Sequence, residues 1–121
     1  MSFPDNATSL RAFPELRRLV EVSPGWKFFP VVEEGVLVEV KGVHVWSPSN
    51  WSDAILVRNT NDAGALRNDA EGYMVWRAAG GLVEVIDELV TRPAPGARLA
   101  SRLAIARGPA LWTPTPRGGW V

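Results

Sequence analysis

Apolar residues near the N-terminus recur at the spacing of an amphipathic helix. The residues that share this face are Leu10, Phe13, Leu16, Leu19 and Val20. Charged side chains occupy the other side, as expected of a surface helix. Because proline lacks an amide hydrogen and suits a first helical turn, the pattern predicts a stable helix over Pro14–Val20. Ser9 is a candidate cap for a looser turn before it, and Ser23-Pro24-Gly25 would end the helix.

The segment from Trp26 to Val45 alternates with the period of two that is typical of strands. Its valines do not keep one phase: Val36, Val38 and Val40 share a face, whereas Val43 and Val45 follow a shift at Lys41-Gly42. Two structures fit this shift. One is a two-residue hairpin at Lys41-Gly42, and the other is a single strand with a bulge at Gly42. Glu34-Gly35 offers a similar turn.

The remaining body alternates between strands and one helix. Ala54–Arg58 and Tyr73–Arg77 read as short strands, and Leu82–Val90 as an amphipathic helix. The expected buried stripe of that helix is Leu82, Val85, Ile86, Leu89 and Val90. Asn, Asp and Gly are frequent in Asn59–Gly72, which predicts a long connection with one helical turn around Ala63–Asn68.

These elements predict an α+β fold in a single domain over residues 1–121. We expect a twisted antiparallel sheet of four to six strands with two helices packed on one face. A length of 121 residues is close to that of a typical single domain. Leu103 and Ile105 could form a late strand that Gly108-Pro109 ends. The C-terminal segment 97–121, rich in Pro, Gly and Arg, is expected to dock on the body.

Composition narrows the class of protein. The chain has no cysteine, which excludes disulfides, thiolate metal sites and cysteine nucleophiles. No apolar run is long enough to span a bilayer, and Met1–Arg11 lacks the basic and apolar parts of a secretory signal. We therefore expect a cytoplasmic protein with no membrane partner.

A net charge of zero hides an uneven distribution. Residues 1–88 hold all thirteen acidic and eight basic residues, a net charge of −5, whereas 89–121 hold five arginines and no acid. The tail arginines are Arg92, Arg98, Arg102, Arg107 and Arg117. Arginines interleaved with Trp could bind single-stranded nucleic acid. However, the arginines are sparse and the pI is about 6.6, so we favour a tail that packs on the acidic body or on a second subunit.

The sequence offers few residues for catalysis. His44 is the only histidine, so acid–base chemistry near neutral pH would depend on it or on carboxylates. In the hairpin alternative Glu39 faces His44 across the strands, with Trp46 nearby, which defines a possible enzyme or ligand site. A surface pair is the simpler interpretation. Glu33-Glu34 and Asp87-Glu88 read as solvated carboxylates. We predict no catalytic residues, no metal and no cofactor.

Six tryptophans are many for this length. Trp26 and Trp76 fall within strand patterns and are expected in the core. The other tryptophans and three tail arginines are candidates for contact with a partner, since Trp and Arg are enriched at binding hot spots. These candidates are Trp46, Trp51, Trp112, Trp120, Arg98, Arg102 and Arg107. The sequence therefore favours a non-catalytic interaction module that binds another protein or itself.

Overall fold

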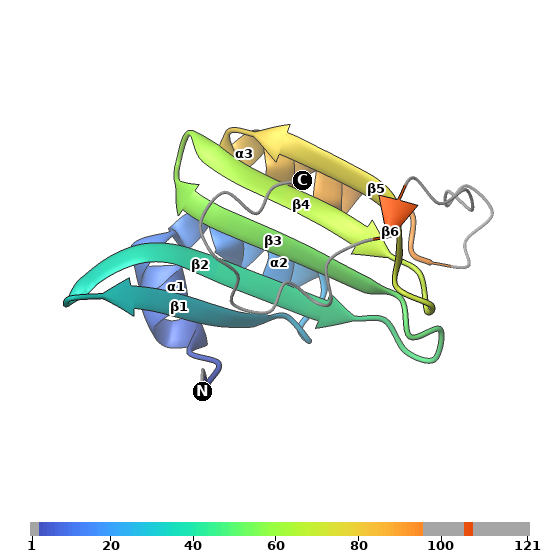
Figure 1. Ribbon diagram of the computed structural model, residues 1–121, viewed down its shortest axis with the longest axis horizontal. Coiled ribbons are helices and arrows are strands. Elements are labelled where there is room, and N and C mark those ends of the chain that lie inside the picture. The colour runs from blue at the N-terminus through green and yellow to red at the C-terminus, as the bar shows by residue number, and fades with distance from the viewer. Residues whose placement is uncertain (1–2, 96–105, 108–121) are drawn as a thin grey trace.

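Five long strands follow one another in the chain and lie side by side in the same order, and a short sixth strand extends their edge (Figure 1). The computed structural model describes residues 3–95 and the backbone of 106–107. The strands are β1 (Lys27–Glu33), β2 (Val36–Val45), β3 (Ser52–Asn59), β4 (Asp62–Asn68), β5 (Tyr73–Gly80) and β6 (Ala106–Arg107). All neighbours are antiparallel, so the expected antiparallel sheet is confirmed.

The turn between β1 and β2 is the one formed by Glu34 and Gly35. Both residues have positive φ, 52° and 79°, which is the backbone of a tight hairpin with strands of the usual twist. Pairing then runs without interruption through Gly42 on both sides of β2, and the β1–β2 register shifts only between Val31 and Val32. Both alternatives for Lys41-Gly42, the hairpin and the bulge, are therefore wrong.

Packing on Gly42 explains why the valines change phase. A Cβ added to Gly42 would lie 2.7 Å from the ring of Phe28 and 2.8 Å from Cγ2 of Ile55. The absence of a side chain lets the Phe28 ring fill this position under the helices. Val40 lies on the helix-covered face of the sheet, whereas Val43 packs with residues of the opposite face. Each half of β2 thus gives its valines to a different face.

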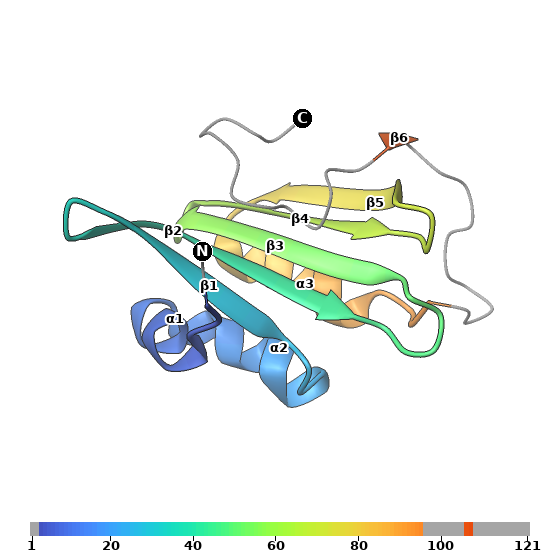
Figure 2. The same ribbon diagram turned by 60° about the horizontal axis from the view of Figure 1, so that its bottom comes forward.

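Three helices and a 3-10 turn cover one face of the sheet (Figure 2). They are α1 (Asn6–Ala12), η1 (Pro14–Leu16), α2 (Arg17–Val22) and α3 (Leu82–Thr91). The expected helices over Pro14–Val20 and Leu82–Val90 and their common face are confirmed. The chain adds α1, whose cap is Asp5: its carboxylate accepts from the Thr8 amide.

The main core lies between these helices and the sheet. Its buried residues are Leu16, Leu19, Trp26, Phe28, Val40, Ile55, Val57, Ala63, Ala65, Trp76, Leu82, Val85, Ile86 and Leu89. The expected burial of Trp26 and Trp76 is confirmed. Within 3–95, no helix is long and apolar enough to cross a membrane.

The prediction of a connection with a helical turn around Ala63–Asn68 is wrong, because these residues belong to β4. Both neighbours, β3 and β5, pair with this strand. Ala63 and Ala65 are buried in the main core, where small side chains leave room for α3 on the sheet. Packing against the neighbouring strands and α3 therefore outweighs the preference of the surrounding Asn, Asp and Gly residues for turns.

Ile86 tests the packing of α3 on the sheet. This side chain is 1% exposed, so Ile86→Ala should lower the free energy of unfolding by about 2–5 kcal/mol through lost burial and a cavity. Val83 lies on the same helix and is 55% exposed. Val83→Ala should change the free energy of unfolding by less than about 0.5 kcal/mol. Urea titration of both variants measures the difference. Equal effects would show that α3 does not pack as described.

Candidate functional site

A buried ion pair lies on the helix-covered face, near the ends of β3 and β4. Arg67 donates to Asp53 through Nε at 2.7 Å and through Nη2 at 3.1 Å, and both residues are almost fully buried. The third nitrogen, Nη1, donates to the carbonyl oxygen of Pro93, which follows α3. A paired guanidinium with this geometry joins the sheet to the chain that leaves the last helix.

Aromatic rings continue from this pair towards the edge of the sheet. The Trp46 indole donates to Asp53 at 3.0 Å, and its ring lies 5.6 Å from the Arg67 guanidinium. His44 packs edge-on against Trp46 with centroids 4.8 Å apart and stacks on Trp26 at 5.7 Å. His44 is thus held between two tryptophans.

Burial lowers the pKa of His44 below its ordinary value of 6.5. The negative charge of Asp53 opposes this change, while the positive charge of Arg67 adds to it. Nδ1 is buried and has no hydrogen-bond partner among the described residues. The surroundings therefore favour a neutral imidazole. A neutral His44 fits a role in packing better than a role as a proton donor.

Arg92 lies at the C-terminal end of α3, 5.0 Å from the ring of Trp76. Burial lowers the pKa of its guanidinium, and the charge of Arg67 adds to the effect. Its Nε has no partner in the described part of the chain. Arg67 and Arg92 thus each form a cation–aromatic pair, with Trp46 and Trp76 respectively.

A cavity of about 30 Å³ lies among these groups. It is lined by Leu19, Val22, Ser23, Trp26, Trp46, Asp53, Leu89, Val90 and Arg92. One water needs roughly 10–15 Å³, whereas sites for organic ligands enclose about 300–1,000 Å³. The cavity is large enough for one or two waters and too small for an organic substrate.

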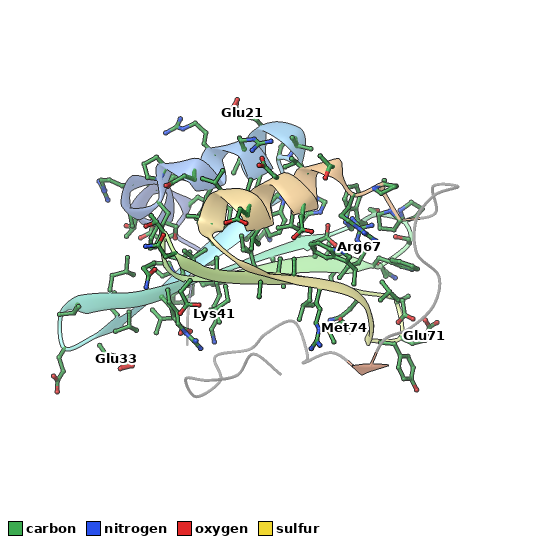
Figure 3. The ribbon with its side chains drawn as sticks, turned by 90° about the horizontal axis from the view of Figure 1, so that it is seen from above. Glu21, Glu33, Lys41, Arg67, Glu71 and Met74 are labelled. Atoms are coloured by element: carbon green, nitrogen blue, oxygen red, sulfur yellow. The ribbon has the colours of Figure 1, made fainter. Side chains whose placement is uncertain are left out.

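The opposite face of the sheet carries a second hydrophobic cluster, here called the open face. Its buried members are Ala54, Leu56, Leu66 and Met74, with Val43 beside them. Figure 3 shows Met74 and Lys41 on this side of the sheet and Arg67 on the helix side. The helices of 3–95 all lie on that other side (Figure 2). The four side chains are 2–5% exposed, so they form a second, smaller core on a face that carries no helix of residues 3–95.

Charged side chains border this cluster. Lys41 and Glu39 lie on β2 and are each 5% exposed, with Nζ 3.5 Å from the carboxylate. Arg58 on β3 approaches the same carboxylate at 3.9 Å and Asp62 at the same distance. The open face therefore has an apolar centre and a border of charges of both signs.

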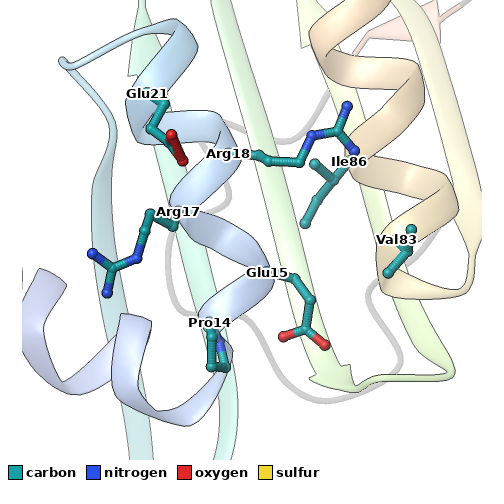
Figure 4. A pocket seen from close by; sticks show the side chains of 7 residues that line it. All are labelled: Pro14, Glu15, Arg17, Arg18, Glu21, Val83 and Ile86. Atoms are coloured by element: carbon teal, nitrogen blue, oxygen red, sulfur yellow. The ribbon is translucent and has the colours of Figure 1, made fainter.

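A groove of about 250 Å³ separates α2 from α3 on the helical surface (Figure 4). Pro14, Glu15, Arg17, Arg18, Glu21, Val83 and Ile86 line it. Arg18 forms an ion pair with Asp87 of α3, which joins the two helices. Four of the seven lining residues are charged, namely Glu15, Arg17, Arg18 and Glu21.

The structure brings together only part of the residues singled out in the sequence. Glu39 and His44 lie on opposite faces, so the enzyme or ligand site that combined them is not formed. His44 and Trp46 do meet, on the helix side. Trp51 is half-buried in the β2–β3 loop, where its carbonyl accepts from the Trp46 amide at 2.7 Å.

The remaining candidates belong to the tail. Arg98, Arg102, Trp112 and Trp120 lie outside the described residues, as does the expected strand at Leu103 and Ile105. The backbone of Arg107 is part of β6. Their role in binding stays a prediction.

Sequence reasoning missed Asp53, Arg67 and Arg92. Asp53 stands directly before an apolar strand but looks like the end of a polar loop, and Arg67 was assigned to a connection. Had Ala63, Ala65 and Arg67 been read as alternate positions of a strand, Arg67 would have fallen on a buried face. A charge at such a position needs a partner, which is the signal that points to Asp53.

In the described part of the chain, no group of three His, Cys, Asp or Glu side chains could hold a metal ion. No protein-family model, curated protein or solved structure matches this chain. The function must therefore be argued from the surfaces themselves.

Removal of the charge of Asp53 should destabilise the fold. Asp53→Asn leaves the buried Arg67 guanidinium without its counterion, so the free energy of unfolding should fall by about 3–5 kcal/mol. Asp62→Asn makes the same change in an exposed ion pair and should cost less than about 1 kcal/mol. Chemical denaturation of both variants measures the difference. Similar losses would argue against a special role for the buried pair.

The lowered pKa of His44 should make stability depend on pH. The unfolded chain takes up the proton near pH 6.5, before the folded chain does, so the free energy of unfolding should decrease as pH falls from 7.5 towards 5.5. His44→Gln lacks this contribution and should lose less stability over the same range. Urea titrations at both pH values provide the test. Equal losses would mean that His44 titrates as in the unfolded chain.

Proposed function

We propose that this protein is a non-catalytic interaction module that binds an extended apolar segment of another protein on its open face. The observation that carries the proposal is the cluster of Ala54, Leu56, Leu66 and Met74, which lies across the sheet from all helices of 3–95. The cytoplasmic location expected from the sequence is part of this proposal.

The edge of β5 supports this proposal. Within the described residues, β6 pairs with β5 only at Tyr73 and Met74, so Val75–Gly80 have no strand partner on that edge. An exposed edge can bind an extended peptide through main-chain hydrogen bonds, while a neighbouring face receives its side chains. Met74, a member of the apolar cluster, lies on β5 directly before this unpaired stretch. Edge and face together suit an extended segment rather than a small molecule.

The alternatives have less support. A ligand or enzyme site at His44 and Trp46 would have to use the cavity beside Trp46 and Asp53, which is large enough only for water. A nucleic-acid function would depend on tail arginines outside the described residues. Self-association through the open face uses the same surface as the proposed function and is separated from it by experiment.

A display library of random 12-residue peptides, selected on the full chain, provides the test. Selected peptides should be apolar and extended, and Leu56→Ser should weaken their binding about 10- to 100-fold, since a buried Leu contributes roughly 1.5–3 kcal/mol. Val83→Ser on α3 is the matched control, and His44→Gln should also leave the affinity within a few-fold. Fluorescence polarisation with one labelled peptide gives all four dissociation constants.

Each other result has a definite meaning. Binding that depends on Val83 but not on Leu56 would move the site to the helical surface and contradict the proposal. Sedimentation equilibrium that shows a dimer of the full chain, broken by Leu56→Ser, would assign the open face to self-association instead. Circular dichroism and denaturation of each variant confirm that it is folded.

A further inference from the structure

We propose that the groove between α2 and α3 binds a lysine side chain of a partner protein, with the Glu15 carboxylate as the acceptor for its ammonium group. The groove lies on the helical surface, whereas the open face lies on the other side of the sheet. This inference therefore does not rest on the proposed function.

The first argument is a carboxylate oxygen that lacks a donor. Oε1 of Glu15 is buried, and no described residue donates a hydrogen bond to it. Burial of such an oxygen without a donor is costly, and most buried polar atoms in proteins have a partner. Glu15 lines the groove, and Figure 4 shows its side chain on the side of η1 that faces α3. The groove therefore offers an acceptor that the described part of the chain leaves unused.

The neighbouring arginines do not supply this donor. Arg18 follows Glu15 by three residues, a spacing at which an ion pair can form on a helix. It pairs with Asp87 of α3 instead. Figure 4 shows the Arg17 side chain pointing away from α3. A cation carried by a partner can therefore take the place beside Glu15.

The apolar part of the groove suits the aliphatic stem of a lysine. Pro14 and Val83 line the groove from opposite helices, and Ile86 adds apolar surface from α3. Val83 is 55% exposed, so much of its side chain is available for contact. Lysine packs its methylene groups along apolar surface while its ammonium group stays with a polar partner. The groove and Glu15 together match both parts of this side chain.

Size and chemistry favour a lysine over other cations. The groove holds about 250 Å³, less than the 300–1,000 Å³ or so of sites that enclose organic ligands. A single side chain fits it better than a whole small molecule. Arginine presents a planar fork that matches both oxygens of a carboxylate, whereas lysine carries a compact charge. The compact charge suits the one oxygen of Glu15 that is buried without a donor.

NMR titration of the full chain with N-acetyl-lysine methylamide tests the proposal. The methyl signals of Val83 and Ile86 should shift, with a dissociation constant in the millimolar range because the ligand has few atoms. N-acetyl-norleucine methylamide has an aliphatic side chain without the ammonium group. It should bind about tenfold or more weakly, because the hydrogen bond to the charged carboxylate is lost.

A matched pair of variants tests the role of the carboxylate. Glu15→Gln keeps the size of the side chain and removes its charge. It should weaken binding of the lysine amide about tenfold or more and leave binding of the norleucine amide unchanged. Glu71→Gln makes the same change in the exposed turn before β5 and should leave both dissociation constants unchanged.

Several results would overturn the proposal. They are the absence of any shift at the groove, equal binding of the two amides, and lysine binding that survives Glu15→Gln. Tighter binding of the corresponding arginine amide, or of free butylamine, would also contradict it, because the groove would then select a different cation. Circular dichroism and denaturation show whether each variant is folded, and the comparison of the amides on the wild-type chain needs no variant.

One further variant separates this inference from the proposed function. Leu56→Ser changes the open face and should leave binding of the lysine amide unchanged. If the lysine amide binds through Glu15 but no displayed peptide depends on Leu56, the proposed function fails and the lysine groove stands. If peptides depend on Leu56 and the lysine amide does not bind, the reverse holds.

Discussion

The governing constraint of this protein is that a single sheet has two faces and the helices cover only one. A meander of five long strands places alternate residues on each side. The short helices α1, α2 and α3 supply one core. Apolar side chains on the other side, such as Leu56 and Met74, form a cluster of their own. Within residues 3–95 no helix lies over this second cluster, so it is the surface on which the proposed function depends.

The Arg67–Asp53 pair holds several elements together on the helix-covered face, near the ends of β3 and β4. A buried charge requires a partner, and here each nitrogen of the guanidinium donates one hydrogen bond: Nε and Nη2 donate to the Asp53 carboxylate, and Nη1 donates to the Pro93 carbonyl. The same carboxylate fixes the Trp46 indole. One ion pair therefore sets the position of a loop aromatic, of the last helix and of the chain beyond it, while leaving only a cavity of about 30 Å³.

Sequence patterns predicted those elements whose periodicity is strong. The helix Leu82–Val90 and the alternating strands were found because burial imposes a period on their apolar residues. β4 was missed, because Ala63 and Ala65 are small for reasons of helix packing that only the fold reveals. The turn or bulge expected at Gly42 was wrong for a similar reason. The ring of Phe28 on the neighbouring strand occupies the space that a side chain at Gly42 would need. The alternation of Ala63, Ala65 and Arg67 could have placed Arg67 on a buried face. Its pairing with Asp53 could not be predicted, because the two residues are distant in sequence and leave no local pattern.

The bond from Arg67 to Pro93 also has a consequence for the order in which the fold can open. It ties the chain after α3 to β4, and the same guanidinium is tied to Asp53 on β3. The end of the last helix cannot leave the sheet without removing a partner from a buried charge, which is costly. We therefore expect the end of α3 and the adjoining ends of β3 and β4 to open as one cooperative unit in hydrogen exchange.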